Sequence, residues 1–422
     1  KKNNIFLTIK GRHHDGVKFI SQALKKGAKY IVSSKKIKKH KDKVIKVDNE
    51  ISFLNNFASQ KRAKSKAKII AITGSAGKTS LKNLLKDHLD SFGKTFCSPK
   101  SFNNYLGVPL SLSELNVAHQ FGIFEVGMSK AGEIHSLSKL IKPHIGIITN
   151  IGEAHIENFK NLNGIAKAKS EIINNIKKGG TLILNRDDKY FNYFKKKAKL
   201  NNLSVFSFGI NKKSDVHPIS IYKTKKEKQL TLKINGQNLK FKIKDQNIHN
   251  VLATLTLLKV LNLNFFKTVY RFKNFQPSEG RGRIYKVKRY KKIFKLIDES
   301  YNANPLSVKN AIKNFDSIKK EKFKKYLLLG DMLELGNKSE SLHKNLSKVI
   351  NNSDIDKVFI KGINTLTTYK NLFKKKRGNI FQQEEDVDFT LNNIISNNDY
   401  LMIKGSNATG LNNLSKKIIK GY

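Results

Sequence analysis

The decapeptide AITGSAGKTS at residues 71–80 decides the fold of the chain. Before it, residues 68–72 (KIIAI) form an apolar run with the length of a short buried strand. After it, Leu81, Leu84 and Leu85 begin an apolar stripe with helical spacing. A strand, a tight glycine loop and a helix in this order predict a site for a nucleoside triphosphate. The reason is that backbone N–H groups and the helix N-terminus both face the phosphates.

The side chains of this loop support the same interpretation. Lys78 is expected to neutralise phosphate charge, and the Thr79 hydroxyl is expected to bind magnesium. The spacing G-x-x-G-K-T is shorter than the common G-x-x-x-x-G-K-[ST], so its position between a strand and a helix carries much of the argument. The residues expected to bind the nucleotide here are Gly74, Ser75, Ala76, Gly77, Lys78, Thr79 and Ser80.

The bulk composition bounds the size and the partners of the protein. The chain has 422 residues, of which 39% are hydrophobic, which suffices for a substantial core divided over two or three domains. Its 82 Lys+Arg against 32 Asp+Glu give a net charge of +50. This excess is typical of a nucleic-acid binder, or of a lysine-rich composition spread over solvated faces. The lysines are scattered without a basic arm or a nucleic-acid motif, so no nucleic-acid partner is predicted.

The single cysteine, Cys97, excludes an intramolecular disulfide and suits a reducing compartment, so a cytoplasmic location is predicted. No apolar run approaches the roughly 18 residues that a membrane span needs. The first residue is Lys1 rather than Met, and we expect the natural beginning of the chain to be missing.

The chain divides into three segments by composition and pattern. Residues 1–60 contain short apolar runs around a helical segment, as in a small, incomplete α/β unit, and residues 61–68 (KRAKSKAK) are predicted to be a linker. From 68 to about 275, short strands alternate with helices, which predicts a mostly parallel sheet. Residues 274–282 (NFQPSEGRG) are predicted to be a hinge before a second α/β domain. The strands expected in the two domains are 121–126, 144–149 and 181–184, then 293–297, 326–329, 357–360 and 400–403.

Several polar residues follow predicted strands in the first α/β domain. Glu125 comes at the end of an apolar strand, where a carboxylate can face the ligand crevice and bind magnesium, or can be an ordinary turn residue. His155 ends a glycine loop and is either a second metal ligand or a structural histidine. Lys169 lies in a predicted helix at 165–176, where lysines usually face solvent.

Further polar groups lie at and beyond the predicted hinge. Arg281 beside two glycines can reach phosphate across a closing cleft, or can be solvated. Residues 297–305 (IDESYNANP) concentrate acidic, aromatic and amide groups in one loop, which favours a binding site there. Pro305 is predicted to open a helix at its first position.

Together these motifs resemble the Mur ligases. They run in family order over nearly the whole chain, from about residue 4 to residue 406. The motifs are TGSAGKTS (73–80), SFNNYLGVPLSL (101–112), FEVGMSKAGEI (124–134), TNIGEAHIENF (149–159), AKAKSEI (166–172), DESYNANP (298–305), GDMLELG (330–336) and KGS (404–406). Within the family, YNANP and GDMLELG resemble the motifs of the branch that joins D-alanyl-D-alanine to UDP-N-acetylmuramoyl-tripeptide. Sister ligases and folylpolyglutamate synthases share the short loop but differ at these two motifs.

The resemblance implies an α/β protein with the three-domain architecture of the family. A partial UDP-binding domain is expected at 1–62, a central P-loop ATPase domain with a mostly parallel sheet at 63–277, and a Rossmann-like ligase domain at 278–422. Residues 6–28 resemble the uridine-nucleotide domain. The Asp-Ser-Arg segment that precedes them in the family is absent, which fits the expected missing beginning.

The resemblance also implies roles in catalysis and metal binding. Lys78, His155 and Lys169 are the expected catalytic residues. Thr79, Glu125, His155 and Lys169 are expected to hold two Mg²⁺ ions, with Lys169 contributing if CO₂ has converted it to a carbamate. ATP is the expected nucleotide.

Further positions are carried over from the family to ATP and to the peptide substrates. Asn250, Arg281, Asp298 and Glu299 are expected at ATP. The expected substrate contacts are Asn103, Asn104, Tyr301, Asn302 and Asn304. Three positions depart from the family pattern: Gln246 replaces a histidine, Glu299 an aspartate and Asn407 an arginine.

The implied reaction is amide-bond formation through an acyl phosphate, by a cytoplasmic monomer. One alternative is another ligase of the superfamily, which adds a single amino acid to a UDP-muramoyl peptide or glutamate to folate. The others are a nucleic-acid-stimulated NTPase and a non-catalytic nucleotide-binding module.

Overall fold

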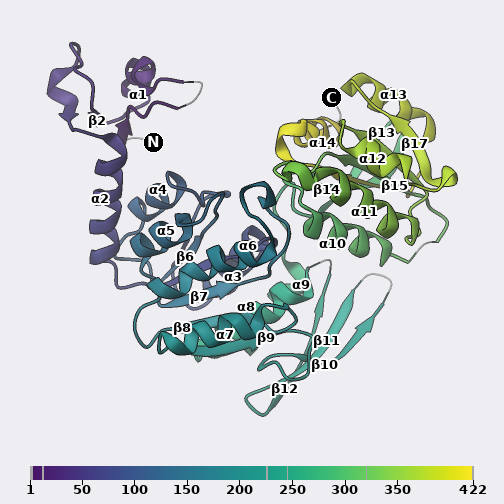
Figure 1. Cartoon of the computed structure of the whole chain (residues 1–422), viewed down its shortest axis with the longest axis horizontal. Coiled ribbons are helices and arrows are strands. Elements are labelled where there is room, and N and C mark those ends of the chain that lie inside the picture. Colours follow the sequence, from purple (N-terminus) through teal and green to yellow (C-terminus); the bar gives the residue numbers. More distant parts are fainter. Residues whose placement is uncertain (1–2, 12–13, 225–226, 245, 320, 421–422) are drawn as a thin grey trace.

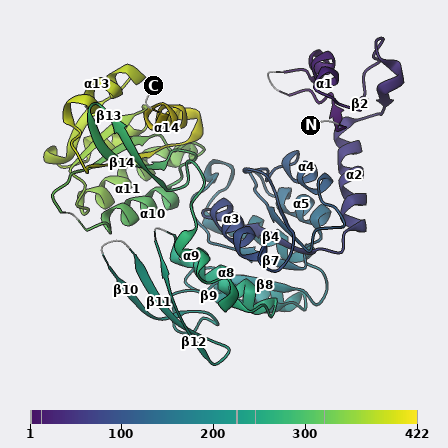
Figure 2. The same ribbon diagram turned by 180° about the vertical axis from the view of Figure 1, so that it is seen from behind.

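The computed structural model describes residues 3–11, 14–224, 227–244, 246–319 and 321–420. Three units follow one another along the chain, with the N-terminal and C-terminal units on opposite sides of a central one (Figures 1 and 2). Residues 12–13, within the stretch that resembles a uridine-nucleotide domain, lie outside the described residues.

The N-terminal unit is a small parallel sheet on a long helix. Its strands are β1 (Ile5–Leu7), β2 (Tyr30–Ser33) and β3 (Val44–Lys46), in the order β1-β2-β3. Its helices are α1 (Ile20–Lys25) and α2 (Glu50–Lys64). The predicted linker at 61–68 is therefore wrong for its first half, because α2 continues through it. Buried Arg62 fixes that end of α2, donating to the carbonyl oxygens of Ile141 (2.6 Å) and Lys142 (2.7 Å) in the central unit.

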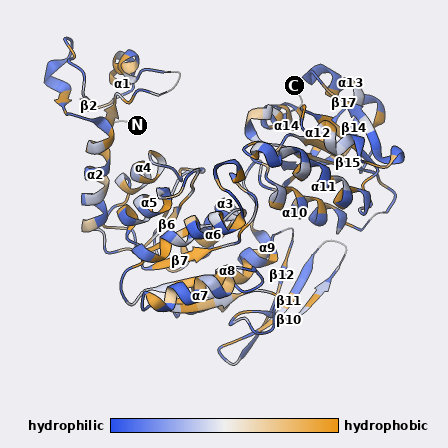
Figure 3. Cartoon of the chain, viewed as in Figure 1, coloured by the Kyte–Doolittle hydropathy of each residue, from blue (hydrophilic) through white to orange (hydrophobic). Residues whose placement is uncertain are grey.

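The central unit is built on a six-stranded, all-parallel sheet in the order β5-β6-β4-β7-β8-β9. The strands are β4 (Lys68–Thr73), β5 (Thr95–Cys97), β6 (Phe121–Glu125), β7 (Ile145–Ile148), β8 (Thr181–Asn185) and β9 (Ser204–Phe208). The helices are α3 (Lys78–Leu89), α4 (Gly107–Ser113), α5 (Glu133–Ile141), α6 (Leu162–Lys169), α7 (Phe191–Leu200), α8 (Ile248–Val260) and α9 (Arg271–Asn274). The apolar strands are covered by helices on both faces (Figure 3). Because β4 pairs with β6 on one side and β7 on the other, its carboxyl end is a topological switch point, where such sheets bind ligands.

An antiparallel sheet interrupts the expected alternation of strands and helices. It consists of β10 (Pro218–Lys223), β11 (Lys228–Ile234) and β12 (Gln237–Ile243), and it projects below the C-terminal unit in Figure 1. Asn235 and Gly236 join β11 to β12 with φ of 52° and 81°. This sheet contradicts the prediction that strands and helices alternate from 68 to about 275. The Asn-Gly pair between two alternating apolar runs is a strong hairpin signal in the sequence.

The C-terminal unit is a second six-stranded sheet in the order β13-β14-β18-β15-β16-β17, parallel except for the edge strand β13. The strands are β13 (Arg283–Arg289), β14 (Lys292–Glu299), β15 (Lys325–Gly330), β16 (Lys357–Lys361), β17 (Arg377–Ile380) and β18 (Tyr400–Lys404). The helices are α10 (Pro305–Asp316), α11 (Ser339–Asn351), α12 (Thr365–Lys370), α13 (Glu384–Ile394) and α14 (Leu411–Lys420). Pro305 opens α10 as predicted, with Asn304 as its N-cap.

Short 3-10 turns complete the fold. They are η1 (Gly16–Phe19), η2 (Lys41–Lys43), η3 (Ile156–Asn158), η4 (Ser170–Asn175), η5 (Phe265–Lys267), η6 (Gly336–Lys338), η7 (Lys374–Lys376) and η8 (Asn407–Thr409). The helix predicted at 165–176 is an α-helix only up to Lys169, and η4 continues it. Lys169 thus lies where the helix changes geometry.

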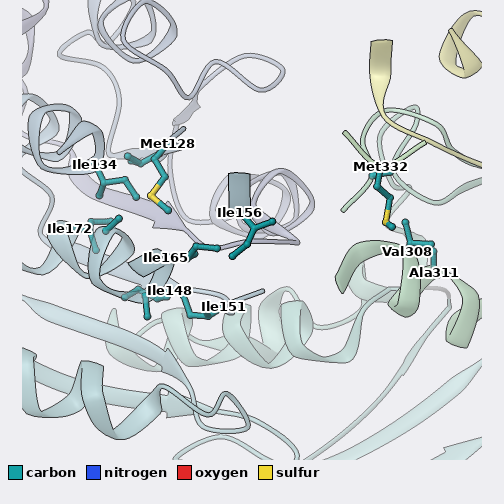
Figure 4. Packing of buried hydrophobic residues seen from close by; sticks show 14 of the residues in the cluster. Met128, Ile134, Ile148, Ile151, Ile156, Ile165, Ile172, Val308, Ala311 and Met332 are labelled. Carbon is teal, nitrogen blue, oxygen red and sulfur yellow. The ribbon is translucent and has the colours of Figure 1, made fainter. Parts of the chain in front are cut away.

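One cluster of buried apolar side chains includes residues of the central and the C-terminal units. Figure 4 shows its labelled members in two groups, with Val308, Ala311 and Met332 of the C-terminal unit apart from the rest. Within the part of the chain that the structure describes, no helix has the length and apolar character of a membrane span.

Candidate active site

A cavity of about 900 Å³ lies where the central unit meets the C-terminal unit. Its walls come from the loop at 74–80 (the P-loop), from the residues after β6 and β7, from the start of α8 and from the loop after β14. Most of the predicted site residues line it. These are Ser75, Ala76, Gly77, Lys78, Thr79, Ser80, Asn103, Asn104, Glu125, His155, Asn250, Arg281, Glu299, Tyr301, Asn302 and Asn304.

The P-loop has the tight backbone that its glycines allow. Gly74 and Gly77 have φ of 143° and 83°, and a Cβ at Gly74 would lie only 1.9 Å from Thr149 Oγ1. Lys78 Nζ donates to the carbonyl oxygen of Gly74 at 2.7 Å. Burial lowers the pKa of Lys78, and the charge of Arg281 adds to this effect. The loop therefore presents backbone donors and an ammonium group to one side of the cavity.

Oxygen atoms that suit magnesium meet where α3 begins and β6 ends. Thr79 Oγ1 donates to Glu125 Oε2 at 2.8 Å, and Asn103 Nδ2 donates to Glu125 Oε1 at 2.7 Å. Among the described residues, no three His, Cys, Asp or Glu side chains gather as a metal cluster. Magnesium commonly binds through one or two carboxylates together with substrate phosphates, so a hydroxyl and one carboxylate beside a P-loop fit this ion.

Lys169 is buried, with 1% of its surface exposed, and does not face solvent as helix lysines usually do. Burial lowers its pKa well below the ordinary value, and the charge of Lys78 contributes further. An amine in this setting holds its proton weakly. Three predicted site residues, Lys169, Gly74 and Asp298, are not among the residues that line the cavity.

His155 faces the C-terminal unit. Its Nδ1 atom lies 2.7 Å from Glu334 Oε2, and this contact lowers the pKa of Glu334. His155 itself has a left-handed backbone, with φ of 58°. His155, the predicted metal ligand, thus contacts Glu334 in the loop that follows β15.

Residues predicted at the nucleotide divide into two groups. Arg281 faces the cavity, with its guanidinium 4.3 Å from the centre of the Tyr301 ring and Nη2 3.2 Å from Ser101 Oγ. Asn250 lies beside the P-loop, because a Cβ at Gly77 would be 3.2 Å from its Oδ1. Asp298, in contrast, accepts from the backbone N–H of Gly280 at 2.8 Å and supports the loop that carries Arg281.

Two further predicted positions have structural partners. The side chain of Gln246 donates to the carbonyl oxygens of Phe272 and Phe275 and so holds the end of α9. Asn104 Oδ1 accepts from the backbone N–H of Gly107 at 2.8 Å, at the start of α4.

The sequence patterns missed two buried lysines. Lys82 Nζ donates to the carbonyl oxygens of Ser98 (2.7 Å) and Lys100, and lies 3.9 Å from Glu125 Oε2. Lys404 Nζ donates to the carbonyl oxygen of Asn302 at 2.6 Å and lies 3.4 Å from Glu299 Oε2. Burial lowers the pKa of both lysines. Two signals were available: Lys82 follows Lys78 by one helical turn, and Lys404 begins the KGS motif at 404–406.

The chain matches two models of one family of ligases. The Mur ligase middle domain matches residues 72–258, and the Mur ligase glutamate ligase domain matches residues 282–407. With the P-loop sheet, the Rossmann-like C-terminal sheet and the shared cavity, these matches show that the chain belongs to the Mur ligase family.

Within that family, the relatives are UDP-N-acetylmuramoyl-tripeptide–D-alanyl-D-alanine ligases. The one from Rickettsia prowazekii is 34% identical over 98% of this chain and 92% of its own length. The one from Bacillus subtilis is 28% identical over 100% of this chain and 91% of its own length. The predicted resemblance to this branch is confirmed.

Solved structures agree with the sequence relatives. MurF from Acinetobacter baumannii has a TM-score of 0.86 at 26% identity, covering 100% of this chain and 91% of its own. MurF from Thermotoga maritima, solved in complex with ADP, has a TM-score of 0.84 at 22% identity, covering 100% and 95%, and supports the fold. The predicted α/β, three-domain Mur ligase architecture is confirmed.

Proposed function

We propose that this chain is an ATP-dependent ligase that joins D-alanyl-D-alanine to UDP-N-acetylmuramoyl-tripeptide, producing the pentapeptide precursor of peptidoglycan. The observation that carries the proposal is the cavity in which the P-loop of the central unit faces the YNANP loop of the C-terminal unit. Relatives that bear this name match almost the whole chain.

The proposed reaction begins with activation of a carboxylate, because a free carboxylate is a poor electrophile for an amine. The terminal carboxylate of the tripeptide attacks the γ-phosphate of ATP, which gives an acyl phosphate and ADP. The amine of D-alanyl-D-alanine then attacks the acyl carbon, and inorganic phosphate leaves as the amide forms. Lys78 and Arg281 provide positive charge beside the phosphates as charge shifts between oxygens. The C-terminal unit covers the cavity and protects the acyl phosphate from water.

We further propose that Thr79 and Glu125 hold Mg²⁺, with His155 and Lys169 completing two metal positions. Bound magnesium would supply positive charge at the phosphoryl oxygens. Asn250, Glu299, Tyr301 and Asn302 are proposed to contact the nucleotide and the acceptor from the facing walls.

A carbamate on Lys169 is the second chemical proposal at this site. The neutral amine that burial favours attacks CO₂, forms a carbon–nitrogen bond and releases one proton, which turns a cation into an anion that can bind metal. ¹³C-labelled bicarbonate should give a carbamate NMR signal in the wild type and none in Lys169→Ala. Lys167→Ala, which changes the neighbouring lysine of α6, should keep the signal. No signal in the wild type would contradict the carbamate.

The test of the function is phosphate release from ATP and Mg²⁺, with UDP-N-acetylmuramoyl-tripeptide, with and without D-alanyl-D-alanine. We expect release to require both substrates and mass spectrometry to detect the pentapeptide product. Lys78→Ala should reduce this activity by about 100-fold or more, since it removes a charge that faces the transferred phosphate. Undiminished activity in that variant would contradict the assigned role.

Substrate profiling separates this proposal from its alternatives. Turnover with single amino acids or folates would indicate another ligase of the superfamily, and stimulation by nucleic acid would indicate a nucleic-acid-dependent NTPase. We propose a monomer in the cytoplasm without a nucleic-acid partner. Scattered lysines and a single cysteine support this proposal, and light scattering with and without DNA tests the monomer and the absent partner.

A further inference from the structure

One side chain joins the C-terminal unit directly to the P-loop. Asn304, the N-cap of α10, is 9% exposed. Its Oδ1 atom accepts from the backbone N–H of Ser307 at 2.9 Å, which caps the helix. Its Nδ2 atom donates to the carbonyl oxygen of Ser75 in the P-loop at 3.1 Å. The oxygen of this amide therefore caps a helix of the C-terminal unit, while its nitrogen binds the central unit.

Ser75 is itself a junction of hydrogen bonds. Its backbone N–H donates to the carbonyl oxygen of Asn150 at 2.9 Å. Its hydroxyl donates to the carbonyl oxygen of Gly152 and accepts from the N–H of Gly152, both at 2.9 Å. Its own carbonyl oxygen accepts the bond from Asn304. A shift of the P-loop backbone at Ser75 therefore changes the bond to the C-terminal unit.

The same turn of α10 packs on the segment after β7. A Cβ at Gly152 would lie 2.8 Å from Leu306 Cδ2, so Leu306 occupies the space of a side chain there. Figure 4 shows Ile151 and Ile156 of this segment on the side of the central unit, with Val308 and Ala311 of α10 on the other side.

A second contact lies at the far end of this segment. Glu157 donates its backbone N–H to the carbonyl oxygen of Glu334 at 3.3 Å, and Lys338 Nζ donates to the carbonyl oxygen of Lys160 at 2.9 Å. Residues 149–160 thus form the surface on which the C-terminal unit packs. Asn304 connects that unit to the P-loop.

We propose that Asn304 is a positioning residue that couples nucleotide binding in the P-loop to docking of the C-terminal unit. This inference rests on the proposed function in taking the P-loop as the phosphate site. Since one hydrogen bond belongs both to the loop and to the interface, a nucleotide that favours this loop conformation also favours docking. Thermodynamic linkage then requires that docking of the C-terminal unit strengthens nucleotide binding by the same free energy. Asn304 then acts through the P-loop rather than as the predicted substrate contact.

Asn304→Asp separates the two roles of the side chain. Aspartate caps a helix as well as asparagine does, but it has no N–H to donate, and its oxygen would face the carbonyl of Ser75. Asn304→Ser also keeps a cap, without repulsion and without the reach to Ser75. The matched control is Ser307→Ala, which removes the hydroxyl of the capping box and leaves the Asn304 amide free to bind Ser75.

The readouts are ADP affinity by calorimetry in Mg²⁺ and the radius of gyration by X-ray scattering with and without ADP. We expect ADP to make the wild type more compact. Both Asn304 variants should bind ADP about tenfold more weakly and lose the compaction. Ser307→Ala should melt at a lower temperature but keep wild-type affinity and compaction.

Two results would overturn the proposal in different ways. Wild-type affinity and compaction in both Asn304 variants would reject the coupling alone, and so would equal losses in Ser307→Ala. No ADP binding by the wild type would reject the proposed function and the coupling together.

Discussion

Lysine has two distinct roles in this protein. Most of the 82 Lys+Arg residues lie on solvated surfaces, yet Lys82, Lys169 and Lys404 are each 1% exposed, and Lys404 lines the cavity. Burial lowers the pKa of all three. Composition alone describes the first role, and only the packing around each side chain identifies the second.

His88 is the residue whose burial should make folding sensitive to pH. It is fully buried on α3, its Nδ1 lies 2.9 Å from the carbonyl oxygen of Leu84, and its ring lies 4.0 Å from that of Phe272. Desolvation lowers its pKa from 6.5 to about 4. Between these values the unfolded chain binds a proton that the folded chain does not.

We therefore expect the contribution of His88 to the free energy of unfolding to be constant above pH 6.5 and to fall as the pH drops towards 4. The loss is about 3 kcal/mol over this window. His88→Leu should remove this part of the pH dependence in urea unfolding, while His40→Gln, at an exposed histidine, should not. Parallel stability curves for the wild type and His88→Leu would contradict the prediction.

At the scale of elements, helix ends carry the connections between units. Asn304 begins α10 and reaches the P-loop, and Arg62 near the end of α2 reaches the end of α5. The preference of proline for the first helical position predicted the start of α10, but no sequence pattern showed that α2 continues into the basic stretch. A run of lysine, arginine and alanine suits a helix as well as a linker, and contact with a neighbouring helix decides between them.

Arg62→Met tests the junction between α2 and α5. The guanidinium donates to two carbonyl oxygens at the end of α5, and its removal leaves both without this partner. We expect the unfolding free energy to fall by about 2–3 kcal/mol and the melting temperature of the central unit to fall by roughly 5–10 °C.

The controls for this prediction lie on the same helix. Arg62→Lys should recover only part of the loss, because an ammonium group lacks the planar fork that spans two carbonyls. Lys64→Ala, at an exposed position of α2, should change the melting temperature little. Equal melting of Arg62→Met and the wild type would show that this contact does not stabilise the junction.

At the scale of the molecule, the cavity lies where the C-terminal unit packs against the segment 149–160 of the central unit. One wall comes from the P-loop and the neighbouring loops of the central unit, and the facing wall comes from the loop after β14. The N-terminal unit stands apart on α2 (Figure 1). The site therefore depends on how the C-terminal unit docks.

Glu334→Ala should weaken this docking. Glu334 Oε2 lies 2.7 Å from His155 Nδ1 and so joins the C-terminal unit to the central unit, and a polar contact at this partly exposed position is worth about 1 kcal/mol. Its loss should shift the ratio of docked to undocked molecules by about fivefold, which X-ray scattering would detect as a larger radius of gyration. Glu340→Ala, at an exposed residue of α11, is the control. An unchanged radius in Glu334→Ala would show that the pair does not hold the units together.

The sequence by itself determined the elements of this protein and the outline of its site. Apolar runs bounded by turns predicted most strands of both large sheets, and the glycine loop predicted the P-loop, because strand and helix periods and turn chemistry are local properties. Glu125 was predicted at the end of a strand, facing the ligand crevice, and it lines the cavity there, where it accepts from Asn103 Nδ2.

Only the tertiary structure decided what each polar side chain does. Asn304 and Ser75 are 229 positions apart, and no local pattern shows that they share a hydrogen bond. The burial of Lys169, the turn of Asp298 away from the cavity and the contact of His155 with Glu334 likewise follow from packing between distant segments. Desolvation and hydrogen-bond partners are properties of three-dimensional surroundings, so they set pKa values and roles that residue type and spacing leave open.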